Sequence, residues 1–300
     1  MNDYDESMDL QQMRYVVAVA EEQSFTRAAE RCFVVQSALS HQIKALEREI
    51  GVQLFARTSR RVELTAAGEA FLAAARVSLD AAKRAVADAA AADGQVRGEL
   101  TIGVIPTVTA IDVPSVLGMF REQYPAVYIK LRTGGSERFI ADIASGQLDI
   151  AMLGLAESAR PEGVAFRELA REQLVAVMPE THALAQRKRI RLQDLAGEVF
   201  VDFPSASAGR AQTDSAFQAA GLERDVAFEA MTIDLMCGLI EQGLAVALLS
   251  PRAIPRHARV AAVQVTDGPR RVEYLAWSDF NQAPAARAFL ECISGHYVGF

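Results

Sequence analysis

The chain of 300 residues contains, from 33 to 55, the stretch FVVQSALSHQIKALEREIGVQLF, whose residues divide into two sets by helical spacing. Apolar residues recur at steps of three and four, as on the buried side of a helix: Leu39, Ile43, Leu46 and Ile50. Polar and cationic residues occupy the other side: Gln36, Ser37, Ser40, His41, Lys44 and Arg48. Glutamine offers both a donor and an acceptor to an adenine edge, serine can serve in either role, and lysine and arginine pair with phosphates. This side of the helix therefore has the side chains needed to contact DNA.

The charge of the chain restricts where a nucleic acid could bind. The formal net charge is −7, so long-range repulsion opposes contact between a polyanion and most of the surface. Residues 36–61 are an exception, because five cations and two anions give them a local net charge of +3. The cations are Lys44, Arg48, Arg57, Arg60 and Arg61. We therefore expect nucleic-acid binding to be local, with this segment as its cationic patch.

Short helices with tight connections are predicted to position this segment. Apolar residues at helical spacing indicate one helix from about Leu10 to Ala20. A second short helix follows the break at Gln23, and the Thr26 hydroxyl could cap it. The helix quoted above ends at Gly51, a residue suited to the left-handed conformation after a helix. Three short helices joined in this way predict a helix-turn-helix.

A β-hairpin is predicted directly after these helices. Two short extended runs, QLFAR and RVELT, lie on either side of a polar turn. A hairpin that packs after a recognition helix forms a wing. Arg57, Arg60 and Arg61 would supply it with phosphate contacts, which fix the register of a protein on DNA without reading sequence.

A long helix is predicted from about Ala66 to Ala92, with Thr65 as its cap. Residues at alternating steps of three and four form a coiled-coil seam along it: Leu72, Ala75, Leu79, Ala82, Val86 and Ala89. Such a seam is typical of a helix that pairs with the same helix of a second protomer. The alternative is an alanine-rich spacer that lies on its own domain, since alanine is the best helix former. Two glycines within residues 93–98 indicate a domain boundary.

From Glu99 onward, short apolar runs alternate with helical ones, which predicts a mostly parallel sheet covered by helices. The alternation occurs twice, and the two sets are alike where a helix passes through a glycine into a short strand, at residues 143–153 and 240–249. This likeness suggests two similar α/β lobes, with a ligand in the crevice at the carboxyl ends of their strands. The C-terminal run RVEYLAWSDF and the helix after it would return to the first lobe, leaving two linker strands as a hinge.

The loops at the expected crevice predict how a ligand would be held. Pro106 and Thr107 follow one strand of the first lobe, just before a helix whose free N–H groups favour an anion, and Ser136 follows another strand in the same way. In the second lobe, Phe203 and Ser205 lie in a serine-rich loop, where the ring could contact an apolar or aromatic ligand. We expect a small carboxylate with its charged end at Thr107 and Ser136. In the alternative interpretation, these serine and threonine residues are ordinary N-caps.

Residues 8–92 closely resemble the N-terminal half of LysR-type transcriptional regulators, through MDLQQMRYVVAVAEEQSFTRAAERC, QSALSHQIKALEREIGVQLFART and RRVELTAAGEAFL. The remainder resembles the effector domain of that family, through VMPETHALA and GLIEQGLAVALLSPRAI. The resemblance implies a winged helix-turn-helix, a linker helix that pairs protomers, and a two-lobe periplasmic-binding-protein-like domain whose cleft takes a small-molecule effector. It also implies a homo-oligomer on promoter DNA, a dimer or a homotetramer, joined through the linker helix and the effector domain.

The resemblance further implies roles for single residues. Four positions correspond to base contacts: Gln36, Ser37, Ser40 and His41. Thr26 corresponds to a phosphate contact and Arg57 to the wing arginine. The chain departs from the family pattern at Val35 and Ser37, because the glutamine between them commonly follows Ser and precedes Pro; Ser37 could then take over the capping role. His41 replaces a common Arg or Lys and so removes a fixed cation.

These patterns predict three segments: a winged helix-turn-helix DNA-binding domain at 1–65, a dimerisation helix and hinge at 66–97, and an effector-binding domain at 98–300. Its first lobe would comprise about 98–168 and 268–300, and its second lobe about 169–267. The expected function is sequence-specific DNA binding controlled by a small organic acid. The alternative is a small-molecule-binding module without a transcriptional role, which residues 99–300 alone would allow.

Other classes of protein are disfavoured by the sequence. It has no HExxH, GxSxG or GxxxxGK[ST] motif, so we expect no catalysis, no bound metal and no cofactor. The three cysteines Cys32, Cys237 and Cys292 are far apart and never in CxxC spacing, which indicates neither a disulfide framework nor a thiolate metal site. Because no apolar run approaches about 20 residues and the N-terminus is acidic, we expect a cytoplasmic protein without a membrane partner.

Overall fold

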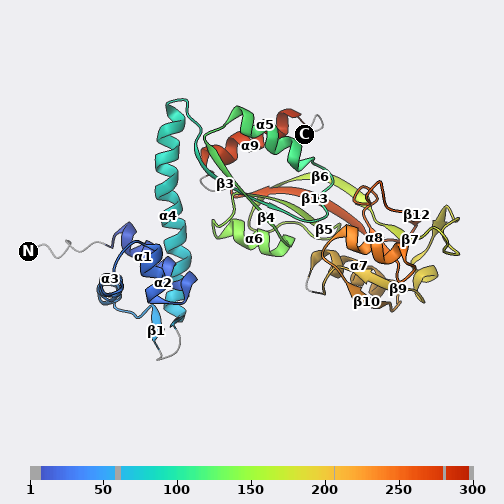
Figure 1. Cartoon of the computed structure of the whole chain (residues 1–300), viewed down its shortest axis with the longest axis horizontal. Helices are drawn as coiled ribbons and strands as arrows, with labels where there is room; N and C mark the ends of the chain where they lie inside the picture. Colours follow the sequence, from blue (N-terminus) through green and yellow to red (C-terminus); the bar gives the residue numbers. More distant parts are fainter. Residues whose placement is uncertain (1–7, 58–61, 206, 280–281, 297–300) are drawn as a thin grey trace, which may run out of the picture. The chain divides into compact units, whose positions relative to one another are not determined.

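The computed structural model describes residues 8–57, 62–205, 207–279 and 282–296. It consists of two compact units, an N-terminal unit that extends to Gln95 and a C-terminal unit that comprises most of the chain from Val96 onward. Figure 1 shows the helices of the first unit and the sheets of the second. Among the described residues, none of the helices has both the length and the apolar character needed to cross a membrane.

The N-terminal unit is a winged helix-turn-helix followed by a long helix. Its elements are α1 (Leu10–Glu22), α2 (Phe25–Arg31), α3 (Gln36–Ile50), β1 (Phe55–Arg57), β2 (Val62–Leu64) and α4 (Ala66–Ala92). Ser24 caps α2 by accepting a hydrogen bond from the Arg27 N–H. The prediction that Thr26 caps this helix is wrong, because Thr26 lies within the first turn with its side chain exposed.

Helix α3 has the two-sided character that its sequence predicts. Leu39, Ile43 and Leu46 are completely buried, and the helix ends at Gly51 in the left-handed region, at φ 73°. Its first residue is Gln36, so Val35 occupies the N-cap position and makes no capping hydrogen bond through its side chain. The prediction that Ser37 takes over the capping role is therefore wrong.

The predicted wing is confirmed as an antiparallel hairpin, in which Phe55 pairs with Leu64 and Arg57 with Val62. The Glu47 carboxylate of α3 accepts hydrogen bonds from the N–H groups of Leu54 (2.8 Å) and Phe55 (3.2 Å). This contact fixes the wing against α3.

The cap and the extent predicted for the long helix are confirmed. Thr65 accepts a hydrogen bond from the Gly68 N–H (3.0 Å) at the start of α4, and its hydroxyl donates to the Gln53 carbonyl (2.7 Å). Thr65 therefore holds the start of α4 beside the chain that leads into the wing.

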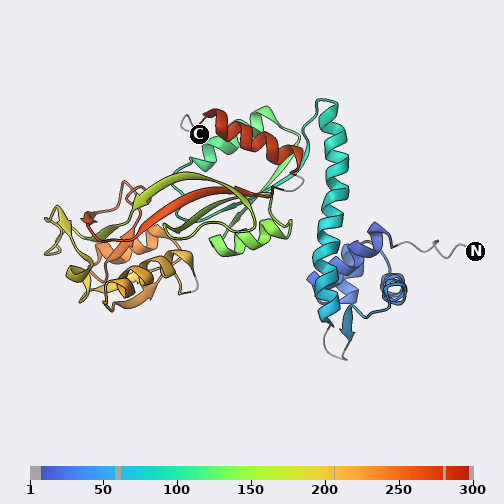
Figure 2. The same ribbon diagram turned by 180° about the vertical axis from the view of Figure 1, so that it is seen from behind.

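The first lobe of the C-terminal unit is a five-stranded sheet with helices on both faces. Its strands are β3 (Gly98–Val104), β4 (Val127–Thr133), β5 (Ile150–Ala156), β6 (Ala165–Gln173) and β13 (Arg270–Trp277), in the order β4-β3-β5-β13-β6. β3, β4 and β5 are parallel, whereas β13 runs antiparallel to both of its neighbours. Helices α5 (Val113–Gln123) and α9 (Pro284–His296) cover one face and α6 (Ser136–Ala144) the other, as both views show (Figure 1, Figure 2).

The second lobe repeats this plan around a smaller sheet. Its elements are β7 (Val175–Pro179), β8 (Arg189–Ile190), a 3-10 turn (Leu192–Leu195), β9 (Val199–Asp202), α7 (Ala208–Ala219), β10 (Asp225–Glu229), α8 (Ile233–Glu241), β11 (Ala247–Leu249) and β12 (Val260–Val265). The strand order is β11-β7-β12-β8, with the parallel pair β10-β9 attached through a bridge between Phe200 and Val246.

The internal duplication suggested by the sequence is present in the topology. The run β3-α5-β4-α6-β5 of the first lobe corresponds to β9-α7-β10-α8-β11 of the second, with the first strand in the middle each time. The last helix of each run leads into its strand through a glycine at φ 73°, Gly146 in one lobe and Gly243 in the other. Only glycine adopts this conformation without strain, which accounts for the shared residue.

Two adjacent crossings join the lobes. One passes through Leu174 between β6 and β7, so the lobe boundary predicted near residue 168 falls inside β6. The other passes through residues 266–269 between β12 and β13. The Leu174 N–H donates to the Pro269 carbonyl (2.9 Å), and the Gln173 side chain donates to the Val265 carbonyl (2.8 Å). The two crossings are thus hydrogen-bonded to each other, as the linker strands of a hinge would be.

We predict that Gly68→Ala destabilises the N-terminal unit by about 1 to 3 kcal/mol, because an added Cβ would lie 2.0 Å from the Leu54 carbonyl oxygen. Gly118→Ala in α5 is the matched control. Its Cβ would meet nothing within 4 Å, so the helix should gain about 0.5 to 1 kcal/mol. Urea unfolding followed by far-ultraviolet circular dichroism tests both variants. Equal stability of the two would show that the start of α4 does not pack closely on the wing.

Candidate functional site

The outward side of α3 presents the polar residues predicted from the sequence. Gln36, Ser37, His41 and Lys44 are exposed, while Ser40 is half-buried. Thr26 is also exposed, on α2. The side chain of Arg57 and the whole of Arg60 and Arg61 lie outside the described residues. The described part of the predicted set thus belongs to α3 and α2.

A concave surface of about 620 Å³ lies between α3 and the wing. Its lining residues are His41, Lys44, Glu47, Arg48, Gly51, Val52, Gln53 and Phe55. The Glu47 carboxylate is engaged by wing N–H groups, whereas Lys44 and Arg48 are both exposed. Exposed cations in an open groove suit the phosphate backbone of a nucleic acid.

The predicted seam on α4 is divided between buried and exposed residues. Ala75 and Leu79 pack against Met13 of α1 in the same chain, so these two are not available to a partner. Leu72 and Ala82 are half-buried, and Val86 and Ala89 are exposed. Within the described chain, only the C-terminal part of the seam is open for pairing between protomers.

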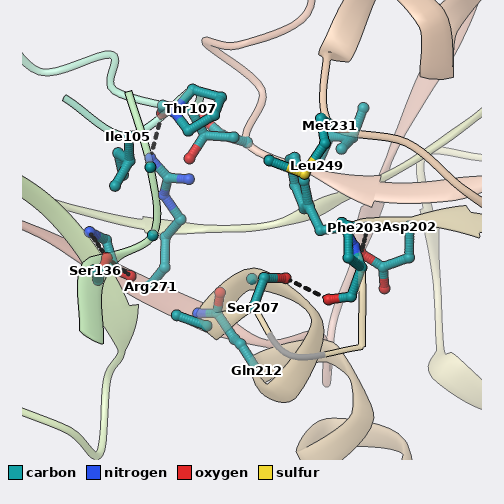
Figure 3. A pocket seen from close by; sticks show the side chains of 18 of the residues that line it. Ile105, Thr107, Ser136, Asp202, Phe203, Ser207, Gln212, Met231, Leu249 and Arg271 are labelled. Atoms are coloured by element: carbon teal, nitrogen blue, oxygen red, sulfur yellow. Dashed lines mark hydrogen bonds between the residues drawn. The ribbon is translucent and has the colours of Figure 1, made fainter. Parts of the chain in front are cut away.

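A cavity of about 400 Å³ lies between the two lobes of the C-terminal unit (Figure 3). Four of the predicted ligand-binding residues line it: Pro106, Thr107, Ser136 and Phe203. Ser205 does not line the cavity and is exposed. Ser207, two residues further on, lines it and caps α7 by accepting from the Arg210 N–H (3.3 Å). The serine of this loop that lines the cavity is thus Ser207, two residues after the predicted Ser205.

The Ser136 hydroxyl is already engaged. It donates to the Gly154 carbonyl and accepts from the Gly154 N–H, both at 3.0 Å, and the residue is 2% exposed. Ser136 therefore ties the start of α6 to β5, and the hydrogen of its hydroxyl is not available to a ligand. Thr107 contributes its carbonyl to an internal hydrogen bond from Arg271 (2.6 Å).

A buried charged cluster at the wall of the cavity escaped the sequence analysis. Arg271 of β13 is 6% exposed and lines the cavity, with its Nε 2.9 Å from the Glu172 carboxylate and its Nη2 bonded to Glu273. Glu273 is completely buried and accepts from the N–H (3.0 Å) and hydroxyl (2.7 Å) of Thr109 and from the Ala110 N–H (2.9 Å). The cluster joins β13, β6 and the loop after β3.

A signal for this cluster was present in the sequence. In RVEYLAW, Arg271 and Glu273 are charged residues two apart in an otherwise apolar strand, so both lie on one face of the sheet. Charged residues on a buried strand face need partners, because unpaired buried charges are strongly destabilising.

On the other wall of the cavity, the charge of Asp202 is also paired. Its carboxylate accepts from the Thr213 hydroxyl (2.6 Å) and lies 2.7 Å from the buried Arg224 guanidinium. The Arg224 guanidinium stacks over the rings of Phe200 and Phe217. The charged residues on both walls of the cavity are thus paired with other residues of the protein.

The three cysteines lie in different places. Cys237 of α8 and Cys292 of α9 belong to separate cores of the C-terminal unit, and Cys32 ends α2 in the N-terminal unit. Burial raises the pKa of all three thiols, and Asp234 and Glu241 add to the effect at Cys237. At Cys32 the neighbouring Arg31 opposes this rise but does not outweigh it, so none of the three thiols has the lowered pKa of an activated thiolate.

A winged helix-turn-helix with an exposed polar face on its recognition helix, followed by a long helix and a two-lobe α/β unit, defines a class of DNA-binding regulators. Residues 10–69 match the family described as bacterial regulatory helix-turn-helix protein, lysR family, and residues 93–297 match the LysR substrate binding domain. The chain therefore belongs to the LysR family of transcriptional regulators, which are not enzymes. A binding module without a transcriptional role does not account for the match of residues 10–69.

Individual proteins of this family are similar over most of the chain. It is 36% identical to the uncharacterized HTH-type transcriptional regulator YnfL of Escherichia coli (strain K12), covering 94% of this chain and 97% of that protein. It is 33% identical to the hydrogen peroxide-inducible genes activator of Pectobacterium carotovorum subsp. carotovorum, covering 83% of this chain and 82% of that protein. The crystal structure of full-length CbnR complexed with its target DNA has a TM-score of 0.65 at 26% identity, covering 95% of this chain and 99% of that one.

We predict that Arg271→Leu destabilises the C-terminal unit by about 3 to 5 kcal/mol, because it leaves the buried carboxylates of Glu273 and Glu172 without their cation. Arg270→Leu, one residue earlier on the same strand and exposed, should change stability by less than about 0.5 kcal/mol. Denaturant unfolding followed by the fluorescence of Trp277, the single tryptophan, tests both variants. Similar midpoints for the two would show that Arg271 does not balance these carboxylates.

Proposed function

We propose that this regulator binds promoter DNA in a manner controlled by a small organic acid held in the cavity between its lobes. The observation that carries the proposal is the cavity itself, whose 400 Å³ suits a small molecule and whose walls come from both lobes. A ligand that contacts both walls can favour one arrangement of the lobes over another.

The lining of the cavity supports an acid with an apolar body. Residues 136–138 at the start of α6 and residues 208–209 at the start of α7 face it from opposite lobes, and helix N-termini favour negative charge. Phe203, Met231 and Leu249 provide apolar contact area (Figure 3). Because the charges of Arg271 and Asp202 are already paired, these walls suit a single carboxylate rather than a dianion.

Thiol oxidation is a less suitable signal for this chain, although one similar protein is a hydrogen peroxide-inducible genes activator. Cys237 and Cys292 lie in separate cores, and burial raises the pKa of each thiol. A thiol that reacts with an oxidant must be accessible and largely deprotonated. We therefore assign control to a bound ligand.

The hinge is the proposed route from ligand to DNA. The two crossings at Leu174 and residues 266–269 are hydrogen-bonded to each other, so a change in lobe arrangement is concentrated there. Pairing of protomers through the exposed end of α4 would then convert a lobe movement into altered spacing of two DNA-binding units. We propose a cytoplasmic homo-oligomer, a dimer or a tetramer, as the functional form.

Within the DNA-binding face, Gln36 and Lys44 are assigned different roles. Gln36→Ala should weaken binding to the specific duplex by about 1 to 3 kcal/mol and relax sequence choice, because it removes a base contact. Lys44→Ala should weaken binding to all sequences alike and lower the salt slope by about one unit, because it removes a phosphate contact. Fluorescence anisotropy with the protein's own upstream intergenic DNA and a scrambled duplex, across a salt series, measures both effects.

The two variants serve as controls for each other. Unchanged discrimination by Gln36→Ala, or a loss by Lys44→Ala that is confined to one sequence, would contradict the assigned roles. Equal and weak binding of the unaltered protein to both duplexes would contradict sequence-specific binding itself.

For the effector, we expect isothermal titration with a panel of small monocarboxylic acids to identify acids that bind. The amide of each such acid should bind at least about tenfold more weakly, because the helix N-termini favour a negative charge. Small-angle scattering with and without a binding acid should differ, whereas DNA affinity should be the same under oxidant and reductant. Binding of neutral compounds without binding of acids would overturn the acid assignment. Superimposable scattering curves would overturn the hinge mechanism.

A further inference from the structure

The turn between α2 and α3 exposes two apolar side chains. Phe33 is 95% exposed and Val35 is 68% exposed. The residues that alternate with them, Cys32 and Val34, are half-buried and pack on the core of the N-terminal unit. The turn thus directs every second side chain outward, immediately before Gln36 of the recognition helix.

Phe33 holds this position in an unfavourable backbone conformation. Its φ is 56°, and its N–H donates to the Glu30 carbonyl (3.1 Å) while the next N–H donates to the Ala29 carbonyl (3.0 Å). In this left-handed region glycine is free of strain and asparagine is tolerated, but an aromatic residue is disfavoured. The residue therefore lowers stability twice, through its backbone and through an apolar ring left in water.

Val35 departs from a second local rule. The other three helices of the N-terminal unit begin with a side-chain cap, from Asp9, Ser24 or Thr65. In the described part of this unit, α3 alone begins without one, because Val35 stands at its N-cap. A serine or threonine there would stabilise the helix that carries the DNA-binding residues.

Phe33 and Val35, separated in the chain only by the half-buried Val34, are thus two exposed apolar residues immediately before Gln36, and at each position another residue type would be more stable. Residues that reduce local stability, as the left-handed Phe33 and the uncapped helix start at Val35 do, are expected at functional sites. We infer that Phe33 and Val35 contact the 5-methyl groups of thymines that flank the base read by Gln36. These methyl groups are the apolar feature of the major groove, and their burial against an exposed ring is favourable. The inference rests on the DNA-reading role proposed for Gln36.

The test uses the full-length protein and the shortest upstream duplex that it binds selectively. Each thymine is replaced in turn by uracil, which removes only the methyl group, and affinities are measured by anisotropy. For the unaltered protein, we expect uracil at one or two positions to weaken binding about fourfold, the factor for one buried methyl-sized group. Phe33→Asn and Val35→Ser should bind the thymine duplex more weakly and lose this discrimination.

Stability measurements separate a contact from a folding defect. Because Asn tolerates the left-handed conformation and Ser can cap α3, neither variant should have a lower Tm than the unaltered protein. Leu10→Asn is the control, since Leu10 is 41% exposed near the other end of α3, where the Met8 N–H donates to Glu49 (2.9 Å). This control should keep the full discrimination between thymine and uracil.

Three results would overturn this inference alone and leave the role of Gln36 intact. One is equal affinity of the unaltered protein for thymine and uracil at every position, and another is full discrimination by Phe33→Asn. The third is a changed sedimentation coefficient of Phe33→Asn with unchanged DNA affinity, which would assign the ring to a contact with a second copy of the chain. Absence of selective binding to any upstream duplex by the unaltered protein would instead contradict the role of the Gln36 face, and this inference with it.

Discussion

The C-terminal unit depends on the pairing of one fully buried carboxylate. Glu273 is inaccessible to solvent, so its charge is tolerable only because Arg271 and three donors from Thr109 and Ala110 surround it. These partners come from β13 itself and from the loop after β3, and Arg271 extends the cluster to Glu172 on β6. The same few contacts therefore fix a cavity loop and brace the strands that lead to the hinge. A ligand that touches Arg271 acts on all of them.

The N-terminal unit uses a related device on its surface. The Glu47 carboxylate of α3 accepts from two successive N–H groups of the wing, as Glu273 accepts from two successive N–H groups of its loop. In both places a carboxylate on a helix or a strand fixes the backbone of a separate segment of the chain. The segments that would contact ligand or DNA are thereby held by hydrogen bonds to a helix or a strand. A carboxylate suits this role, because hydrogen bonds to a charged acceptor are stronger than neutral ones.

Much of this arrangement was predictable from residue periodicity, because burial of one face imposes a regular spacing on α3 and on the strands of both lobes. Loop positions were not, since the loop after β9 directs Ser207 rather than Ser205 to the cavity. The capping residue was not predictable either, because it depends on the exact first residue of the helix. Since α2 begins at Phe25, Ser24 rather than Thr26 is its N-cap. β6 was missed because AFRELAREQ has the composition of a helix, and its pairing with β13 overrides that preference.

Each unit contains residue types that are unfavourable at their positions, but only in the C-terminal unit does the folded chain itself compensate for them. In the C-terminal unit, the buried charges of Arg271 and Glu273 are paired with each other, so they stabilise one arrangement of loop and strand. In the N-terminal unit, Phe33 and Val35 have no such compensation within the turn, where a glycine or asparagine and a serine would be more stable. Uncompensated instability on an exposed surface is retained only if something outside the folded chain offsets it. For a turn that leads directly into a recognition helix, we propose that DNA is the macromolecule that does so.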